Sequence, residues 1–223
     1  MEKIDIAKRV KELNTASDAY YNSDKPIMSD YEFDCKFDEL KKWEEETGIV
    51  LSNSPTQNVG YDVVSNLEKT THSHPMLSLD KTKSVDDLIK FSSGEDCIIS
   101  LKMDGLTVLN TYENGKLQKS ETRGNGEVGE IITHNARVFD DFPINIPFEI
   151  EGEAIITKND FERINTNGEY KTCRNLASGS VRQLDSKIAK DRHVHFVAWK
   201  VPFGCTTYID GFRIAKDYGF EVV

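Results

Sequence analysis

The chain has 223 residues, 38% of them hydrophobic and 30% charged, which suits one sizeable core with a small appended unit. No apolar run approaches the roughly 20 residues that span a bilayer, and the start lacks a signal-peptide pattern, so a cytoplasmic protein without membrane contact is expected. The net charge of −10 argues against tight DNA binding by this chain alone, because phosphate contacts need clustered Lys and Arg.

Metal and disulfide sites are not expected from the sequence. The four cysteines are scattered without a Cys-x-x-Cys pair, which argues against both a zinc site and a disulfide framework. His72 and His74 suggest metal binding only weakly, since no third ligand stands at a useful spacing.

Two amphipathic helices are expected first. Apolar residues at helical spacing over residues 4–22 predict one helix, which an Asp-Lys-Pro segment ends. Ser29 followed by Glu32 is a capping box, and the second helix continues until Gly48. The polar segment 52–57 predicts a hinge between this helical hairpin and the rest of the chain.

Strands are expected after Cys97. An Asn-Gly turn predicts a hairpin over residues 107–122, and further strands are expected at 148–157 and 193–199. Glycines precede an expected helix over 131–138, an arrangement that can offer backbone amides to phosphate. Other short helices are expected at 84–91, 159–164 and 208–218.

The stretch from Ser100 to Gly105 is expected to be a short strand that presents Lys102 and Asp104. A lysine attacks phosphorus only as the free amine, so a nucleophilic role requires desolvation or nearby positive charge to lower its pKa. The isoleucines before it and the apolar run after it predict an apolar setting, and Gly105 would let backbone approach a ligand. The alternative is a surface lysine beside an ordinary turn, because Lys-x-Asp-Gly often occurs by chance.

Further motifs follow in a fixed order. Thr122-Arg123-Gly124 lies one hairpin after Lys102, and Gly152-Glu153 stands in the next expected strand. Together these motifs resemble the adenylation domain of the NAD-dependent DNA ligases of bacteria. The resemblance runs from about Tyr20 to Val223.

The resemblance implies an α+β fold with two domains. Residues 1–60 would form a small N-terminal helical domain, and residues 61–223 an antiparallel-sheet nucleotidyltransferase (adenylation) domain. The family's last lysine-bearing motifs would follow Val223, so the second domain is expected to be incomplete at its C-terminus.

Individual roles also follow from the resemblance. In the family the Lys-x-Asp-Gly lysine becomes covalently linked to AMP, which makes Lys102 the expected catalytic residue. The arginine of the Thr-Arg-Gly motif binds the nucleotide, and the glutamate of the Gly-Glu motif lies beside the ribose. The nucleotide contacts implied are Ser78, Leu79, Ser100, Leu101, Asp104, Gly105, Arg123, Glu153, Arg174, Arg182 and Trp199.

In this family the helical domain binds the nicotinamide mononucleotide (NMN) half of NAD. The matching residues are Tyr20, Tyr21, Asp30, Phe33 and Asp34. Aromatic faces can stack on a cationic nicotinamide ring, and carboxylates accept hydrogen bonds from ribose hydroxyls. Tyr21 stands where the family usually has His, and Phe33 where it usually has Tyr, so each position loses or alters one polar contact to NAD. The alternative is that these rings only pack two helices together.

Other expected contacts have alternatives as well. Ser100 stands where the family usually has Glu, which can loosen nucleotide specificity. Arg174 and Arg182 lie about two helical turns apart and suit phosphate, with surface salt bridges as the alternative. Trp199 takes the place of a Tyr that stacks on adenine, or else packs in the core. Glu151 either supports Glu153 or faces solvent.

The implied activity is that of a DNA ligase. Lys102 would attack the α-phosphorus of NAD, NMN would leave, and AMP would pass from the enzyme to the 5′-phosphate at a nick in duplex DNA. Mg²⁺ is expected to spread charge at phosphorus, and the chain is expected to be a monomer. The alternatives are an ATP- or GTP-using RNA ligase or capping enzyme, and a non-catalytic NAD-binding fragment.

Overall fold

The computed structural model describes residues 3–22, 27–51, 53–56, 67–77 and 80–223. Its helices are α1 (Lys3–Asn22), α2 (Asp30–Thr47), α3 (Val85–Ser92), α4 (Thr133–Ala136), α5 (Lys158–Ile164), α6 (Cys173–Val181), α7 (Ser186–Asp191) and α8 (Tyr208–Asp217). The strands are β1 (Lys69–Thr71), β2 (Leu106–Glu113), β3 (Lys116–Thr122), β4 (Val128–Glu130), β5 (Ile150–Ile155), β6 (His195–Lys200) and β7 (Glu221–Val222). Helices beside a mainly antiparallel sheet confirm the predicted α+β class.

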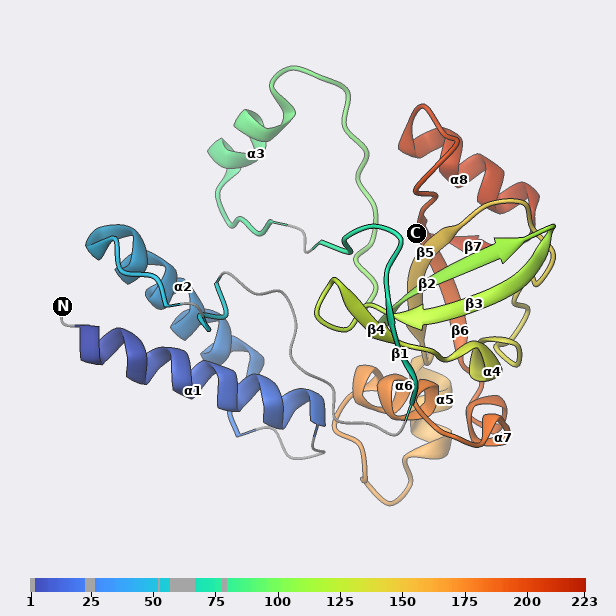
Figure 1. The fold of residues 1–223 in the computed structure, drawn as a ribbon, viewed down its shortest axis with the longest axis horizontal. Coiled ribbons are helices and arrows are strands. Elements are labelled where there is room, and N and C mark those ends of the chain that lie inside the picture. Colours follow the sequence, from blue (N-terminus) through green and yellow to red (C-terminus); the bar gives the residue numbers. More distant parts are fainter. Residues whose placement is uncertain (1–2, 23–26, 52, 57–66, 78–79) are drawn as a thin grey trace.

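The helical hairpin forms as its sequence predicts (Figure 1). Ser29 caps α2 by accepting a hydrogen bond from the Glu32 amide at 3.2 Å, and Gly48 ends α2 with a φ of 67°. The hairpin has its own small core, because apolar positions at helical spacing face each other across α1 and α2. The buried residues of that core are Ile6, Val10, Leu13 and Leu40.

The main sheet has the order β3-β2-β5-β6-β7. Its first four strands are antiparallel, and α8 connects β6 to a parallel β7. The turn between β2 and β3 uses Asn114 and Gly115, both with positive φ, as the Asn-Gly signal predicts. Helix α6 packs on β2 and β5, and this interface continues the core that contains Val108, Ile150 and Leu176.

A second, two-stranded sheet joins β1 to β4, with Thr70 opposite Gly129. Sequence patterns did not predict either strand. The helix expected over 131–138 is largely wrong, because only α4 is helical there and the glycine-rich segment leads into β4. Three-residue strands carry no periodicity of their own, and each is stabilised by a partner that lies far away in the sequence.

The strand expected at Ser100–Gly105 is also wrong. Residues 96–104 have no strand, and β2 begins only at Leu106. Ile99 and Leu101 are 97% and 74% exposed, so the expected apolar setting around Lys102 is not found among the described residues. The reason is that no described strand pairs with this segment, so its apolar side chains have no surface to pack against.

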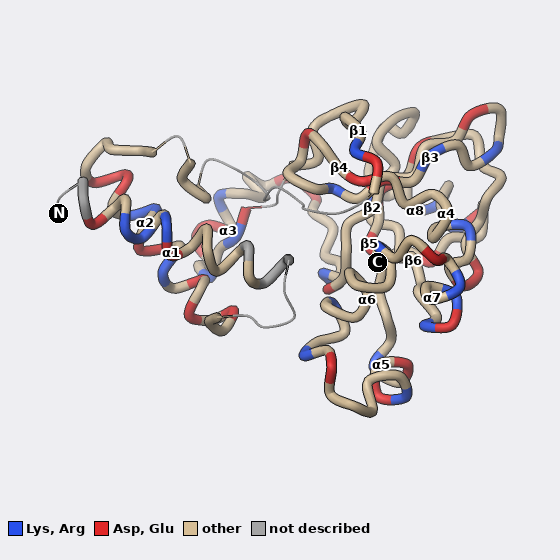
Figure 2. Tube along the Cα trace, turned by 60° about the horizontal axis from the view of Figure 1, so that its bottom comes forward, with Lys and Arg blue, Asp and Glu red and all other residues tan. Residues whose placement is uncertain are grey.

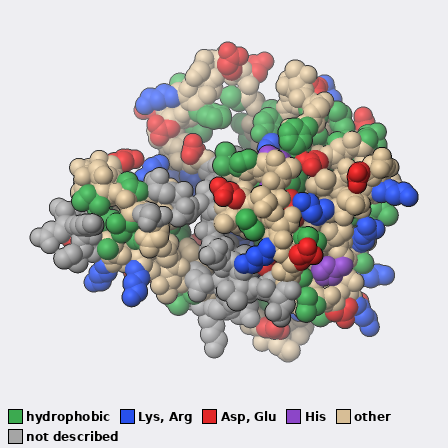
Figure 3. Space-filling model, in the orientation of Figure 1, with side chains coloured by type: hydrophobic (Ala, Val, Ile, Leu, Met, Phe, Trp, Pro, Cys, Tyr) green, Lys and Arg blue, Asp and Glu red, His purple; other side chains and the backbone are tan. Residues whose placement is uncertain are grey.

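Helix α3 stands away from the sheet on the same long segment (Figure 1). Ser84 caps α3 as predicted, through a hydrogen bond from the Asp87 amide. None of its residues is buried, and Leu88, Ile89 and Phe91 are all more than half exposed. Figure 3 shows apolar side chains at the surface in this region, toward the top of the view. No described helix has the length and apolar character needed to cross a membrane.

Candidate active site

Glu153 is the centre of the site. It lies on β5 opposite Thr107 of β2, and the Thr107 hydroxyl donates a hydrogen bond to Glu153 Oε2 at 3.0 Å. Only 7% of Glu153 is exposed. A carboxylate at this depth needs nearby cations or hydrogen-bond donors, since burial disfavours its charged form.

Three cations supply positive charge to this carboxylate. Burial raises the pKa of Glu153 most strongly, whereas the hydrogen bond from Thr107 and the charges of Arg174, Lys102 and Arg123 lower it. The net pKa lies above the ordinary value because burial outweighs these contributions. The cations come from three separate segments: the chain before β2, the loop after β3, and α6. The structure therefore brings four predicted site residues together.

The loop that carries Arg123 is tightly built. The Arg123 amide donates to the Thr107 carbonyl at 3.0 Å, and the Arg123 carbonyl accepts from the Gly126 amide at 3.0 Å. Gly124 has a φ of 55°, and a Cβ at this position would lie 1.9 Å from the Val128 carbonyl oxygen. The glycine after Arg123 is thus required by the turn itself.

Asp104 and Gly105 have clear structural partners. Asp104 Oδ1 forms an ion pair with Arg174 Nη1 at 3.1 Å. This pair links the Lys102 segment to the start of α6. A Cβ on Gly105 would lie 2.1 Å from the Ala154 carbonyl oxygen. Gly105 therefore allows the chain to pass close to β5. The sequence predicted only that Gly105 would let backbone approach a ligand, so this packing role is an additional finding.

The surroundings of Lys102 differ from those expected. Ser100, Leu101 and Lys102 are all exposed, so the described residues do not desolvate the lysine amine. Arg123 and Arg174 supply positive charge to Glu153, the same carboxylate on which the charge of Lys102 acts.

Arg182 points to a different carboxylate from Arg174. It follows the last residue of α6 and places Nε 3.2 Å from Oε2 of Glu130, a β4 residue that is 1% exposed. This is a partly buried ion pair that ties α6 to the two-stranded sheet, so a surface salt bridge does not describe it.

Glu151 is not solvent-facing. It is 1% exposed, and its Oε1 contacts His74 Nε2 at 2.8 Å and Lys200 Nζ at 3.0 Å. Trp199 lies half-buried on β6, where the register with β5 shifts beside Glu151. A buried Glu151 held by two partners fixes the strand that also carries Glu153.

The described part of the helical hairpin shows the surroundings of three residues that are expected to contact NMN: Asp30, Phe33 and Asp34. Phe33 is half-buried and its ring stacks on Phe37 at a centroid distance of 6.2 Å, so it contributes to packing. Asp34 pairs with Lys81 at 3.1 Å, whereas Asp30 is exposed. The side chains of Tyr20 and Tyr21, and residues Ser78 and Leu79, lie outside the described residues.

Comparison with known families gives two matches that together cover most of the chain. Residues 64–223 match the NAD-dependent DNA ligase adenylation domain, and residues 2–60 match the DNA ligase-like N-terminal NAD⁺-binding domain. The chain belongs to the NAD-dependent DNA ligase family. Its site thus occupies the part of the chain that matches the adenylation domain of these ligases.

Individual DNA ligases are similar over nearly the whole chain. A DNA ligase of Lachnoclostridium phytofermentans is 48% identical over 95% of this chain, and one of Ruminiclostridium cellulolyticum is 44% identical over 100%. A DNA ligase of Helicobacter acinonychis is 41% identical over 86%. These matches cover 34%, 36% and 32% of the relatives, so the chain spans about a third of their length.

The ligase motifs did not identify every residue that builds the site. Thr107 and Lys200 sit in strands whose alternation predicted only their face of the sheet. Glu121 is fully buried, although a glutamate in a hairpin strand is normally expected to face solvent. His72 and His74 were weighed only as metal ligands, and each contacts a buried glutamate instead.

Replacing Glu153 with glutamine is expected to stabilise the chain at neutral pH. Because the folded-state pKa of Glu153 is raised, its favourable contribution is present at low pH and is lost as pH rises through that pKa. Glutamine stays neutral, so the free energy of unfolding should rise by about 1 kcal/mol at pH 8 and change little at pH 4. Urea unfolding at both pH values measures this difference.

Glu151→Gln is the matched control for this prediction. Glu151 faces Lys200 and His74 directly, so loss of its charge is expected to destabilise the fold at pH 8. A Glu153→Gln protein that is less stable than the unmodified chain at pH 8 contradicts the argument from burial.

Proposed function

We propose that this chain carries out the self-adenylation step of an NAD-dependent DNA ligase. The observation that supports this proposal most directly is the convergence of Lys102, Arg123 and Arg174 on the buried Glu153. One amine nucleophile beside two guanidinium groups suits attack on a phosphate, because guanidinium groups bind phosphate oxygens in a bidentate geometry.

In the proposed step Lys102 Nζ loses two protons to solvent, one before and one after it attacks the α-phosphorus of NAD. A nitrogen–phosphorus bond forms, the bond from that phosphorus to the bridging oxygen breaks, and NMN leaves with its phosphate. Arg123 and Arg174 stabilise the charge on the phosphate oxygens. Glu153 accepts a hydrogen bond from the ribose, and Trp199 stacks on adenine.

The proposal includes Mg²⁺, which would bind the phosphates of NAD and spread charge at phosphorus. Within the described residues, no three or more His, Cys, Asp or Glu side chains form a group that could hold a metal ion. We therefore assign no residue to Mg²⁺, and the groups of the protein that act on the phosphate in this proposal are Lys102, Arg123 and Arg174.

We propose a two-domain division of labour, with residues 1–60 for the NMN half of NAD and residues 61–223 for adenylation. Separate cores in the helical hairpin and around the main sheet support this division. Exposed Asp30 is free of the packing role that Phe33 has, so it is the described α2 residue best suited to bind ribose.

Nicked duplex DNA is the proposed acceptor of AMP, from which the 3′-hydroxyl at the nick finally displaces it. Figure 2 shows acidic and basic residues interspersed along the described chain rather than gathered in one basic stripe. We therefore expect weak DNA binding by these residues alone. The chain is proposed to act as a monomer.

The donor nucleotide tests the proposal against its alternatives. We expect the purified chain with Mg²⁺ to gain the mass of one AMP on Lys102 when given NAD, and no mass when given ATP or GTP. Intact-mass measurement followed by peptide mapping detects the adduct. Labelling by ATP or GTP instead would favour an RNA ligase or capping enzyme, and NAD binding without an adduct would favour a non-catalytic module.

A further inference from the structure

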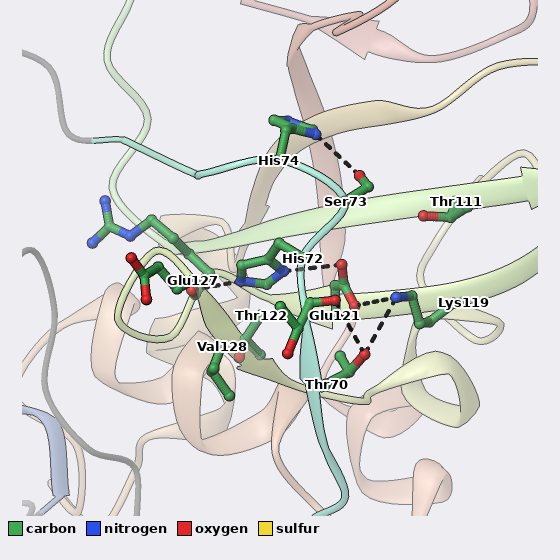
Figure 4. Close-up of polar contacts among 12 residues, drawn as sticks. Thr70, His72, Ser73, His74, Thr111, Lys119, Glu121, Thr122, Glu127 and Val128 are labelled. Atoms are coloured by element: carbon green, nitrogen blue, oxygen red, sulfur yellow. Dashed lines mark hydrogen bonds and ion pairs between the residues drawn. The ribbon is translucent and has the colours of Figure 1, made fainter.

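His72 lies directly after β1, and its side chain is 1% exposed. Both ring nitrogens face acceptors: Nδ1 is 2.9 Å from Glu121 Oε1, and Nε2 is 2.8 Å from the Arg123 carbonyl oxygen (Figure 4). A neutral imidazole carries only one N–H, whereas an imidazolium carries two. Burial raises the pKa of Glu121, but the hydrogen bonds from His72 and Lys119 and their charges outweigh burial and lower that pKa, so Glu121 is an ionised carboxylate that only accepts hydrogen bonds. With Glu121 ionised, the two contacts are both satisfied only if His72 is doubly protonated.

The charges around His72 favour this protonated form. Glu121, on β3, is fully buried and also contacts Lys119 Nζ at 2.7 Å, so one carboxylate lies between two cations. Burial lowers the pKa of His72, but the hydrogen bonds to Glu121 and to the Arg123 carbonyl, with the charge of Glu121, outweigh it and raise that pKa above its ordinary value. Lys119 opposes this rise.

The other segments packed against the ring add few charges. The loop after β3 contributes the main chain of Arg123 and of Glu127, and β4 contributes Gly129, which has no side chain. A Cβ on Gly129 would lie 2.7 Å from His72 Cε1, so the glycine leaves the space that the ring fills.

His72 holds both ends of the loop that carries Arg123. Its ring binds the Arg123 carbonyl, and its own amide donates to the Glu127 carbonyl at 2.9 Å. The Met76 amide adds a third bond, to the Gly126 carbonyl at 2.8 Å. The segment that follows β1 therefore clamps the loop between β3 and β4 at three points.

We infer that His72, kept as an imidazolium by Glu121, is a positioning residue that fixes the Arg123 loop for nucleotide binding. The inference rests on the proposed role of Arg123 in binding NAD. Loss of the ring proton removes the donor to one of the two acceptors, so the clamp should weaken as pH rises through the pKa of His72.

Two variants of the full chain should shift this pH dependence in opposite directions. Glu121→Gln removes the charge that favours the imidazolium, so NAD binding should weaken at a lower pH than in the unmodified chain. Lys119→Met removes the opposing charge, so binding should persist to a higher pH. If the transition of a variant lies about one pH unit from that of the unmodified chain, the NAD affinities of the two proteins should differ by up to about tenfold at a pH between their transitions.

Isothermal titration with NAD from pH 5.5 to 9 measures the affinities, and ¹⁵N signals of the imidazole measure the protonation of His72 directly. His72→Gln retains one donor and should remove the pH-dependent step. His193→Gln is the control, because it removes another histidine–carboxylate pair, a more exposed one with Asp140 at 2.8 Å, outside the Arg123 loop. It should leave the step unchanged.

The two readouts separate the inference from the proposed function. A His72 ring that carries one proton at pH 6, or identical pH profiles for both charge variants and the unmodified chain, overturns the inference while NAD binding stands. Absence of NAD binding at every pH overturns the proposed function and the positioning role together, whereas the ring signals still decide the charge state of His72.

Discussion

Replacing Lys102 with arginine is expected to abolish the AMP adduct. Arginine keeps the positive charge that acts on Glu153, but its guanidinium does not deprotonate in proteins and so offers no amine nucleophile. The rate of adduct formation should fall on the order of 10⁴-fold or more, the usual consequence of removing a nucleophile. Intact-mass measurement over time after NAD addition gives the rate, and NAD affinity should change little.

Lys116→Arg provides the control for this substitution. Lys116 begins β3 beside the Asn-Gly turn and is exposed, so its replacement should leave adduct formation intact. An adduct of equal yield on the Lys102→Arg chain, mapped to another lysine, would show that Lys102 is not the nucleophile.

Replacing Gly152 with alanine is expected to cause a large loss of stability. A Cβ at this position would lie 2.3 Å from the Phe196 ring and 2.5 Å from the Val197 carbonyl oxygen, so β5 and β6 must separate to admit it. Such overpacking should lower the free energy of unfolding by about 3 kcal/mol. It should also displace Glu153, the next residue, and reduce adduct formation. Urea unfolding followed by circular dichroism measures the loss of stability.

Gly211→Ala is the matched control for Gly152→Ala. Gly211 is buried in α8, and a Cβ there would meet its nearest neighbour, Val201 Cβ, at an ordinary 3.4 Å. Alanine favours the helix over glycine by up to about 1 kcal/mol, so this variant should be as stable as the unmodified chain or more stable. Equal losses for both variants would show that crowding at Gly152 is not the cause.

The elements that local signals define were predictable from the sequence. Ser29 and Gly48 bound α2, and Asn114 with Gly115 forms the β2–β3 turn, because capping and turn chemistry act within a few residues. The motif residues Lys102, Arg123 and Glu153 come together because Lys102 precedes β2, Arg123 directly follows β3 and Glu153 lies on β5, and both β3 and β5 neighbour β2.

The parts that were missed depend on distant partners. Leu101 and its neighbours read as a strand, but a strand also requires a ladder partner, which the described residues do not provide. Glu121 and His72 form a pair across 49 positions, and no spacing rule connects such residues. Buried ion pairs of this kind become visible only when the fold brings their strands together.

The pairing of β1 with β4 also has a consequence for the order of folding. The β2–β3 hairpin closes a short loop, whereas β1 reaches β4 only after a long intervening segment has been brought back, at a higher entropic cost. The hairpin can therefore form early, whereas β1 and the adjacent His72 pack against β4 late. For the same reason β1 and His72 should be among the first parts to open in local unfolding, which would release the Arg123 loop while the main sheet remains folded.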